Sequence, residues 1–282
     1  MGGQGTVVIT GASTGIGRAC ALELDRLGFQ VFAGVRKEED GQDLQRQASS
    51  QLTPLLIDVT DPEGINKAAQ TVAALVGTTG VAGLINNAGI AVGGPLEYLP
   101  IAELRRQLEI NVIGQVATTQ AFLALLRPGR GRVINMSSIS GRVAMPFFGP
   151  YAASKFALEA LTDALRLELS PWGIEVVSIQ PGAIATPIWH KSLQKGDQIV
   201  EGFPAQAQSL YGERLNRLRQ TVVKTAQRGS SPEAVAHVVA QALTAKRPKT
   251  RYVVGHDAQL AALFLKFLPD RWRDWLVMRN SR

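Results

Sequence analysis

Short apolar segments alternate with helical segments along the whole chain, and this alternation is the strongest constraint on its fold. Turn residues bound the apolar segments, which predicts strands at 6–10, 30–34, 55–57, 82–85, 133–136, 175–179 and 252–254. Strand–helix alternation of this kind is typical of a parallel sheet with helices on both faces. With 282 residues and no repeat or linker, the chain is predicted to form a single α/β domain around a Rossmann-type, doubly wound parallel sheet.

The composition fits a folded protein without disulfides. Apolar residues make up 45% of the chain, which is enough for a packed core and excludes the disordered class. The single cysteine, Cys20, excludes an intrachain disulfide and fits a reducing cytoplasm. The chain starts on a strand and contains no run of 18 apolar residues. We therefore expect a cytoplasmic protein without a signal peptide or a spanning helix.

The net charge of +7 is concentrated in the last third of the chain. Residues 187–282 contain 16 Lys and Arg against 7 Asp and Glu, whereas residues 1–186 contain 14 against 16. No motif that combines stacking aromatics with basic residues accompanies this excess, so we predict no nucleic-acid partner. Two interpretations stay open, a solvated basic face and a contact that associates the protein with a membrane surface.

A glycine-rich turn, TGASTGIG at 10–17, joins the first predicted strand to a helix predicted at 18–27. Glycines at such a point let the backbone approach a pyrophosphate, which binds at the helix N-terminus. The spacing G-x-x-x-G-x-G differs from G-x-G-x-x-G, but its position between the first strand and the first helix is the expected one. The turn therefore predicts a dinucleotide site that includes Gly11, Ser13, Thr14, Gly15, Ile16 and Gly17.

The end of the second predicted strand indicates which dinucleotide binds. NAD-selective sites place an acid there for the ribose 2′-hydroxyl, and no acid occupies positions 34–37. Arg36 can instead pair with the 2′-phosphate of NADP(H). Alternatively, Arg36 and Lys37 only begin a solvated helix, because three acids follow at 38–40. We predict NADP(H) rather than NAD(H).

Polar or small residues also follow the later strands. Asp58 can accept a hydrogen bond from an adenine amino group, or it only caps a turn. The small residues of NNAG at 86–89 let a ribose lie close to the backbone, while Asn86 can tie neighbouring strands together. Backbone groups at 181–186 can bind a nicotinamide amide. Asn111 falls inside a helix predicted at 101–126. It indicates either a locally opened turn that holds a water near the site or an ordinary buried amide.

Three side chains are predicted to converge on one point. Ser138 follows the strand at 133–136, at the sheet edge where open α/β sheets bind ligands. Tyr151 and Lys155 are four residues apart, so they share one face of a helix predicted at 151–169. A nearby ammonium lowers the pKa of a phenol, which can then exchange a proton with a carbonyl or alcohol oxygen. The alternative is an amphipathic helix with a buried aromatic and a solvated lysine.

Taken together, these motifs resemble the short-chain dehydrogenase/reductase family in its single-domain branch. The similarity rests on TGASTGIG at 10–17, DV at 58–59, NNAG at 86–89, Asn111, Ser138, YAASK at 151–155 and PGAIAT at 181–186, all in the family's order. It implies hydride transfer between NADP(H) and a carbinol carbon, and assembly into a homodimer or homotetramer.

The resemblance also implies a role for each matching residue. Tyr151 is the implied general acid/base, and Lys155 lowers its pKa and binds the nicotinamide ribose. Ser138 holds the substrate oxygen, and Asn111 completes a proton relay through water. The implied cofactor contacts are Gly11, Ser13, Thr14, Gly15, Ile16, Gly17, Arg36, Asp58, Val59, Asn87, Ala88, Gly89, Tyr151, Lys155, Pro181, Gly182, Ile184 and Thr186.

Residues 187–229 have no counterpart in a minimal doubly wound unit, and a segment of this length is usually a lid. Apolar residues recur in it at near-helical spacing: Leu210, Tyr211, Leu215, Leu218, Val222 and Val223. This pattern predicts an amphipathic helix over the substrate site or, equally, core packing. Ile188, Trp189 and Phe203 add to an apolar pocket. Within the family, 84–97 and 150–169 look like hydroxysteroid and retinol dehydrogenases, so we expect a steroid-, retinoid- or lipid-like alcohol or carbonyl as substrate.

The C-terminal stretch 258–282 is rich in Leu, Phe and Trp and is interspersed with Lys266, Arg271, Arg273 and Arg279. This pattern predicts an amphipathic tail. One interpretation is peripheral contact with a membrane surface. The other is packing against the domain or a partner subunit.

Two other functions compete with an alcohol dehydrogenase. A 3-oxoacyl-thioester reductase is the enzymatic alternative, and the long lid and apolar tail argue against it. A non-catalytic NADP(H)-binding sensor is the alternative outside catalysis, and the presence of all four predicted catalytic residues argues against that one. His190, His237 and His256 show no metal-ligand spacing, so we predict no metal site.

Overall fold

The computed structural model describes residues 4–255, 258–260, 262 and 268–280. Its centre is a seven-stranded, entirely parallel sheet in the order β3-β2-β1-β4-β5-β6-β7. The strands are β1 (Thr6–Ile9), β2 (Gln30–Val35), β3 (Leu52–Leu56), β4 (Gly83–Asn86), β5 (Arg132–Met136), β6 (Glu175–Pro181) and β7 (Arg251–Val254). The predicted doubly wound fold is confirmed.

Strand β3 begins three residues earlier than the prediction at 55–57. The reason is its place in the sheet. Pro54 lies opposite Ala33 of β2, and β3 has no partner on its other side within the described residues. A proline is tolerated in an edge strand because the missing N–H faces away from the sheet.

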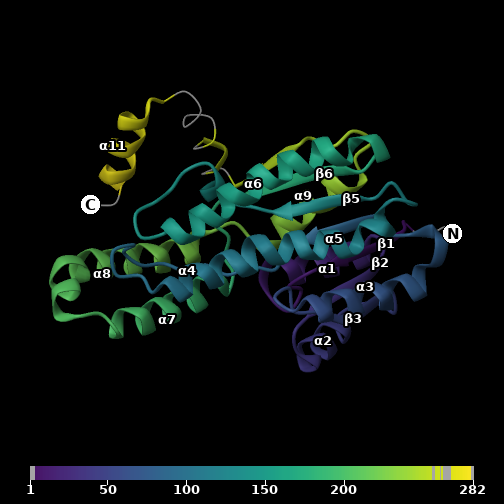
Figure 1. Ribbon diagram of the computed structural model, residues 1–282, viewed down its shortest axis with the longest axis horizontal. Helices are drawn as coiled ribbons and strands as arrows, with labels where there is room; N and C mark the ends of the chain where they lie inside the picture. The colour runs from purple at the N-terminus through teal and green to yellow at the C-terminus, as the bar shows by residue number, and fades with distance from the viewer. Residues whose placement is uncertain (1–3, 256–257, 261, 263–267, 281–282) are drawn as a thin grey trace.

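Helices cover both faces of the sheet (Figure 1). One face carries α1 (Gly15–Arg26), α2 (Glu38–Gln45) and α9 (Pro232–Thr244), and the other carries α3 (Pro62–Val76), α5 (Gly114–Leu126) and α6 (Gly149–Leu169). Strand β1 shows the consequence, since Val7 and Ile9 pack into one core and Val8 into the other. Both cores are almost free of solvent contact, so the strand ends are held rigidly.

Asn111 interrupts the helix predicted at 101–126. Helix α4 (Ile101–Leu108) is joined to α5 by a π-helical turn at Glu109–Ile113 with Asn111 inside it. Such turns are rare and occur often at functional sites. The predicted local opening of the helix is confirmed, and the amide is also fully buried and hydrogen-bonded.

The predicted lid consists of α7 (Ile188–Glu201) and α8 (Ala205–Arg228), which project together with α4 beyond the sheet (Figure 1). A third, smaller core lies beneath them and includes Ile199, Phe203 and Ala207. The predicted apolar stripe of α8 is only partly correct. Its inward face runs through Ala207 and Val222, while Leu210 and Val223 are 55% and 40% exposed because they fall on the flanks of the helix.

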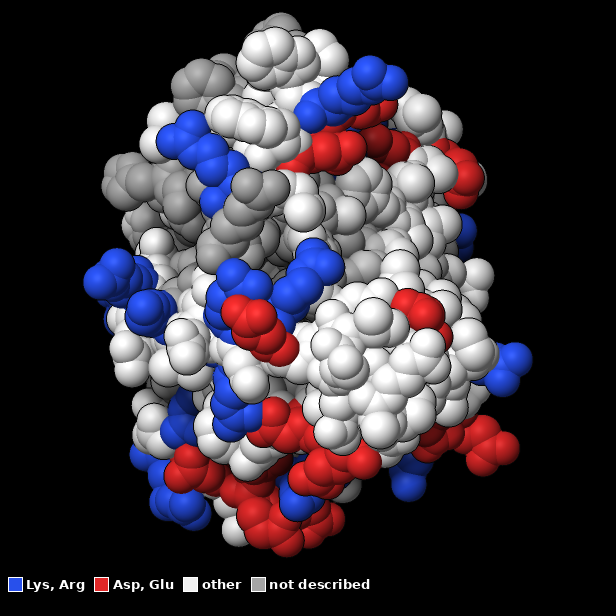
Figure 2. Space-filling view, turned by 90° about the vertical axis from the view of Figure 1, so that its left-hand side faces the viewer, with Lys and Arg blue, Asp and Glu red and all other residues white. Residues whose placement is uncertain are grey.

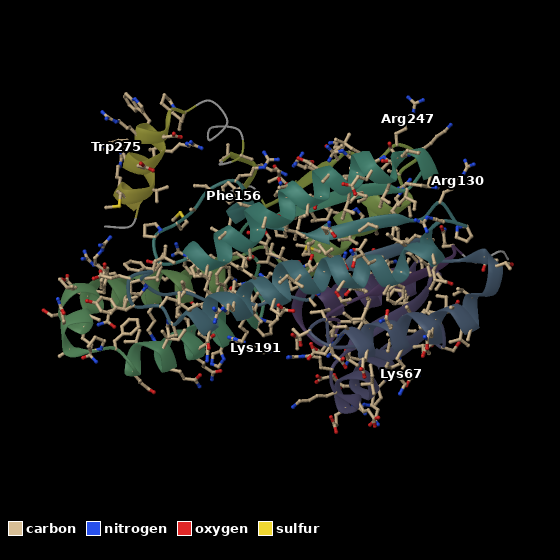
Figure 3. The ribbon with its side chains drawn as sticks, viewed as in Figure 1. Lys67, Arg130, Phe156, Lys191, Arg247 and Trp275 are labelled. Atoms are coloured by element: carbon tan, nitrogen blue, oxygen red, sulfur yellow. The ribbon has the colours of Figure 1, made fainter. Side chains whose placement is uncertain are left out.

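Helix α11 (Asp270–Asn280) is the described part of the predicted tail, and it stands apart from the sheet (Figures 1 and 3). Trp272 and Trp275 are mostly exposed on it. The predicted tail residues 261, 263–267 and 281–282, Lys266 among them, lie outside the described residues. Figure 2 views this end of the molecule and shows basic and acidic side chains interspersed beside a broad uncharged area. Contact of the tail with a membrane and assembly into oligomers stay predictions.

None of the helices in the described part of the chain combines the length and the hydropathy that crossing a bilayer requires.

Candidate active site

A cavity of about 220 Å³ opens at the carboxyl ends of the strands. This is where open α/β sheets bind ligands, next to the reversal of strand order between β1 and β4. The cavity gathers every predicted site residue except Asn111: Gly11, Ser13, Thr14, Gly15, Ile16, Gly17, Arg36, Asp58, Val59, Asn87, Ala88, Gly89, Ser138, Tyr151, Lys155, Pro181, Gly182, Ile184 and Thr186. Residues from six strand ends thus share one site.

The glycine-rich turn is held by backbone geometry and by one asparagine. Gly11 and Gly15 have φ of +67° and +58°, in the left-handed region that side chains disfavour. The Asn87 amide donates to the carbonyls of Thr10 and Gly11, both at 3.0 Å. A Cβ on Gly17 would lie 2.2 Å from the carbonyl oxygen of Gly11, so α1 can pack this closely only with glycine there.

The start of α1 fits a pyrophosphate. Within the described contacts its N-cap, Thr14, makes no side-chain capping hydrogen bond, and no acid occupies the first turn. The first backbone N–H groups therefore lack a side-chain cap, and the residues that carry them line the cavity at the positive end of the helix dipole. Together with the close approach that Gly11 and Gly15 permit, this fits a dinucleotide.

The end of β2 fits a 2′-phosphate. Arg36 is exposed, follows β2 directly and lines the cavity. The acids at 38–40 instead form the first turn of α2, where they complement the helix dipole, and none of them lines the cavity. Asp58 lines the cavity and also accepts hydrogen bonds from the N–H and hydroxyl of Thr60, so its turn-capping role is present as well.

Ser138, Tyr151 and Lys155 form the inner end of the cavity. Ser138 follows β5 in an extended conformation and its hydroxyl accepts from Ser140 N–H at 3.1 Å. Tyr151 and Lys155 lie one turn apart on α6, with the ammonium 5.7 Å from the centre of the phenol ring. The Lys155 ammonium donates to the Met136 carbonyl at 2.7 Å. The predicted convergence of the three groups is present.

The pKa values show what burial does to these groups. Burial raises the pKa of the Tyr151 phenol, and a hydrogen bond with Ser138 opposes that rise. The net lowering of this pKa that the sequence predicted is therefore wrong, because desolvation of the buried phenol prevails. Burial lowers the pKa of Lys155 to about 8, and the charge of Glu159 opposes that change.

Asn111 lies behind the cavity rather than in its wall. Its amide accepts from Ile90 N–H at 2.9 Å and donates to the Ile90 carbonyl and the Ser154 hydroxyl. Gln107, which the sequence analysis missed, supports the same loop through Val92 N–H and the Ile90 carbonyl. Its spacing of four residues from Asn111 was the available signal. Both amides brace the loop after β4 against α6.

Helix α7 supplies the outer wall of the cavity. Ile188 and Trp189 line it, as does Lys191, a cation that the sequence analysis did not single out (Figure 3). The Trp189 indole donates to the Ile184 carbonyl at 2.7 Å, and its ring meets Phe148 edge-on. Beyond this pair a second cavity of about 110 Å³ lies between α7 and α8, with Phe148 in its wall. The lid side of the cavity is thus lined by apolar groups together with one cation.

Comparison with known proteins identifies the family. Residues 5–197 match the family described as short chain dehydrogenase. The chain belongs to the short chain dehydrogenase family. The resemblance predicted from the motifs is confirmed, and the chain is an oxidoreductase that acts on CH–OH groups.

Similar proteins align over almost the whole chain. The NADPH-dependent 3-dehydrocapnine reductase of Ornithobacterium rhinotracheale is 39% identical, and the alignment covers 98% of this chain and 96% of that protein. Retinol dehydrogenase 5 of Mus musculus is 38% identical over 98% of this chain and 90% of its own length. A short chain dehydrogenase from Burkholderia cenocepacia J2315, solved in complex with NADP, has a TM-score of 0.73 at 27% identity, covering 95% of this chain and 94% of its own.

Proposed function

We propose that this chain uses NADP(H) to interconvert a hydrophobic alcohol and its ketone or aldehyde. One observation carries the proposal. Ser138, Tyr151 and Lys155 meet where the cavity passes from the glycine-rich turn to the apolar residues of α7. A substrate oxygen held at Ser138 lies between a dinucleotide on one side and an apolar wall on the other.

The side chains have complementary tasks in this proposal. Tyr151 gives its phenolic proton to the carbonyl oxygen in reduction, and the phenolate takes a proton from the alcohol in oxidation. The Ser138 hydroxyl hydrogen-bonds the same oxygen. The Lys155 ammonium offsets the negative charge of the phenolate. Bound NADP(H) supplies or accepts the hydride.

The choice of NADP(H) has support from two sides. The Ornithobacterium relative is named as NADPH-dependent, and the Burkholderia structure holds NADP. In this chain Arg36 is the charged side chain at the end of β2 that lines the cavity. A guanidinium at this point matches a 2′-phosphate.

A hydrophobic substrate is favoured by the lid side of the cavity and by the relatives. Ile188 and Trp189 line the cavity, and Phe148 stands between it and the second cavity. Retinol dehydrogenase 5, by its name, acts on a hydrophobic alcohol. We infer the same class for this chain, with a steroid-, retinoid- or lipid-like carbon skeleton.

The test is a panel of steroid ketones, retinal, medium-chain aldehydes and a 3-oxoacyl thioester, followed by NADPH and NADH consumption. We expect turnover with NADPH on hydrophobic substrates and a loss on the order of a thousandfold in kcat for Tyr151→Phe. NADPH binding should survive that substitution. Turnover confined to the thioester would identify the alternative reductase, and tight NADPH binding without any turnover would favour the sensor.

A further inference from the structure

A buried carboxylate lies one helical turn beyond Lys155. Glu159 is four residues further along α6 and is only 7% exposed, on the same buried face as Lys155 at 5%. Neither the reaction proposed above nor the cavity wall uses it. A buried carboxylate is costly unless it is paired and hydrogen-bonded, so its surroundings need an explanation.

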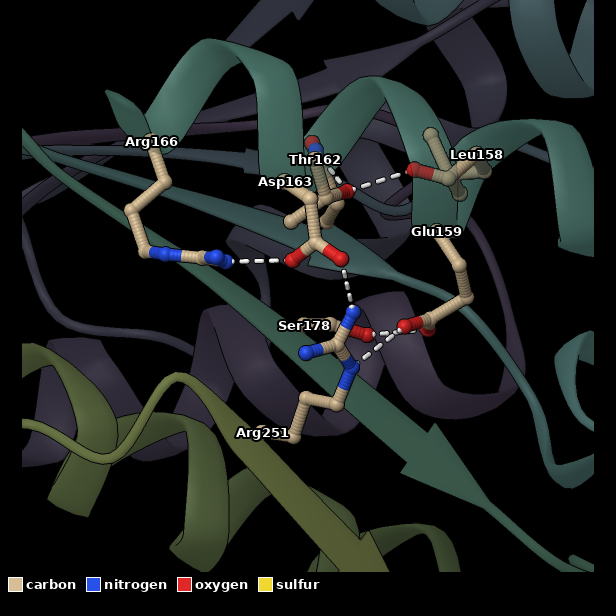
Figure 4. Close-up of polar contacts among 8 residues, drawn as sticks. Leu158, Glu159, Thr162, Asp163, Arg166, Ser178 and Arg251 are labelled. Carbon is tan, nitrogen blue, oxygen red and sulfur yellow. Dashed lines mark hydrogen bonds and ion pairs between the residues drawn. The ribbon is translucent and has the colours of Figure 1, made fainter.

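The carboxylate is clamped from two strands (Figure 4). The Ser178 hydroxyl of β6 donates to one oxygen at 2.5 Å, and Arg251 Nε of β7 donates to the other at 2.8 Å. Arg251 also donates to Asp163 at 2.6 Å, and Asp163 accepts in turn from Arg166. Burial alone would raise the pKa of Glu159, but the donors around it bring that pKa below its usual value. The group is therefore a fixed negative charge.

Few other charges face Lys155. On its own helix the titratable groups beside it are Tyr151 and Glu159, and its ammonium donates to the carbonyl of Met136, the last residue of β5. On α4 and the π-helical turn, Arg105, Arg106 and Glu109 are exposed, and Glu103 is partly exposed and paired with Arg106 and Lys195. From β7 the nearby charge is Arg251, which is already paired with Glu159. Among the described residues, Glu159 is the negative charge that acts on Lys155.

We propose that Glu159 is a positioning residue: its clamped carboxylate, one turn from Lys155 on the same buried face of α6 and held on the strand next to Met136, keeps the Lys155 side chain in its ammonium form. This inference rests on the function proposed above, in which Lys155 acts as an ammonium. The clamp also links the far edge of the sheet to the reaction, because Arg251 of β7 holds the carboxylate in place.

The direction of the expected effect follows from the two opposing influences on Lys155. Burial brings its pKa to about 8, within reach of neutral pH, and the Glu159 charge holds it up. Removing that charge lowers the pKa further. The ammonium is then lost at a lower pH, so activity that needs it falls earlier as the pH rises.

The experiment compares Glu159→Gln with Asp163→Asn in profiles of kcat/KM against pH, from about pH 6 to about pH 10. Both carboxylates are bonded to Arg251, but Asp163 lies a further turn away and is 40% exposed, which makes it a matched control. We expect the alkaline limb of Glu159→Gln to move down by about 0.5 to 1 pH unit. Asp163→Asn should retain the wild-type profile.

A Glu159→Gln profile that coincides with the wild type, even at a lower rate, would show a merely structural role and overturn the inference. Should Glu159→Gln fail to fold, Glu159→Asp keeps the charge at a shorter reach and should place the alkaline limb at its wild-type pH. A shifted limb in that variant would equally contradict the proposal.

Failure of the proposed function shows itself separately, as wild-type turnover that persists in Tyr151→Phe. In that case the pH dependence of NADPH binding is measured in Glu159→Gln and Asp163→Asn. The same downward shift is expected for Glu159→Gln only.

Discussion

The two walls of the cavity are built in different ways. The cofactor wall consists of strand ends and the glycine-rich turn, held by two cores in which side chains such as Ile9 and Phe122 have no solvent exposure. The lid wall consists of α7 and α8 on a much smaller core around Ile199 and Phe203. Backbone geometry therefore defines the cofactor wall, whereas side-chain packing defines the lid. Substrate preference can change in the lid without disturbing the cofactor site.

The largest expected effect contrasts two glycines. In Gly17→Ala the added Cβ collides with the Gly11 carbonyl at 2.2 Å, whereas a Cβ on Gly212 of α8 meets nothing within 4 Å. We expect Gly17→Ala to weaken NADPH binding on the order of a hundredfold, because the turn must move. Gly212→Ala should leave binding unchanged. Fluorescence titration with NADPH measures the affinity of both variants. Equal affinities would contradict the proposed difference between the two walls.

A second substitution tests the outer end of the cofactor wall. Arg36→Gln removes the charge beside the proposed 2′-phosphate, and because the side chain is exposed we expect a loss of about tenfold in NADPH affinity. NADH affinity should not change, since NADH lacks that phosphate. Lys37→Gln, at the N-cap of α2, is the control and should alter neither. Parallel losses for both cofactors in Arg36→Gln would refute the assignment.

The lid wall is probed through its own core. Phe203→Ala removes a ring that packs against Tyr98 with centroids 5.8 Å apart. We expect KM for hydrophobic substrates to rise about fivefold, because the cavity left by the ring loosens the core that supports the lid, with NADPH affinity unchanged. Leu210→Ala, also in the lid but 55% exposed, should leave KM as it is. A Phe203→Ala variant that loses NADPH binding would show that the two walls are not independent.

The smallest effect is expected at the surface of the lid. Asp197 of α7 pairs with Arg219 of α8, and both side chains are about half exposed. Exposed ion pairs contribute little, so Asp197→Asn should change KM by less than about twofold and lower Tm by less than about 2 °C. Thermal unfolding and steady-state kinetics test this. A larger change would mean that the pair, rather than the small core, holds α7 against α8.

Local features of the sequence predicted much of this protein. Strand–helix alternation, the glycines at 11–17 and the four-residue spacing of Tyr151 and Lys155 follow from backbone geometry and helix periodicity, which act over a few residues. The opened turn at Asn111 was also predictable from an asparagine within a helical segment. The glycines at 11–17, Tyr151, Lys155 and Asn111 all lie in or beside the cavity.

Contacts between distant segments could not be predicted in the same way. Arg251 and Glu159 are 92 residues apart in the chain, and no periodicity pairs them. Burial reversed the expected direction of the Tyr151 pKa, because desolvation depends on every segment packed around the phenol. The inward face of α8 likewise depends on what lies beneath that helix. Spacing along the chain therefore specified which chemical groups share the cavity, whereas packing between remote elements set their charge, their burial and the wall that a substrate meets.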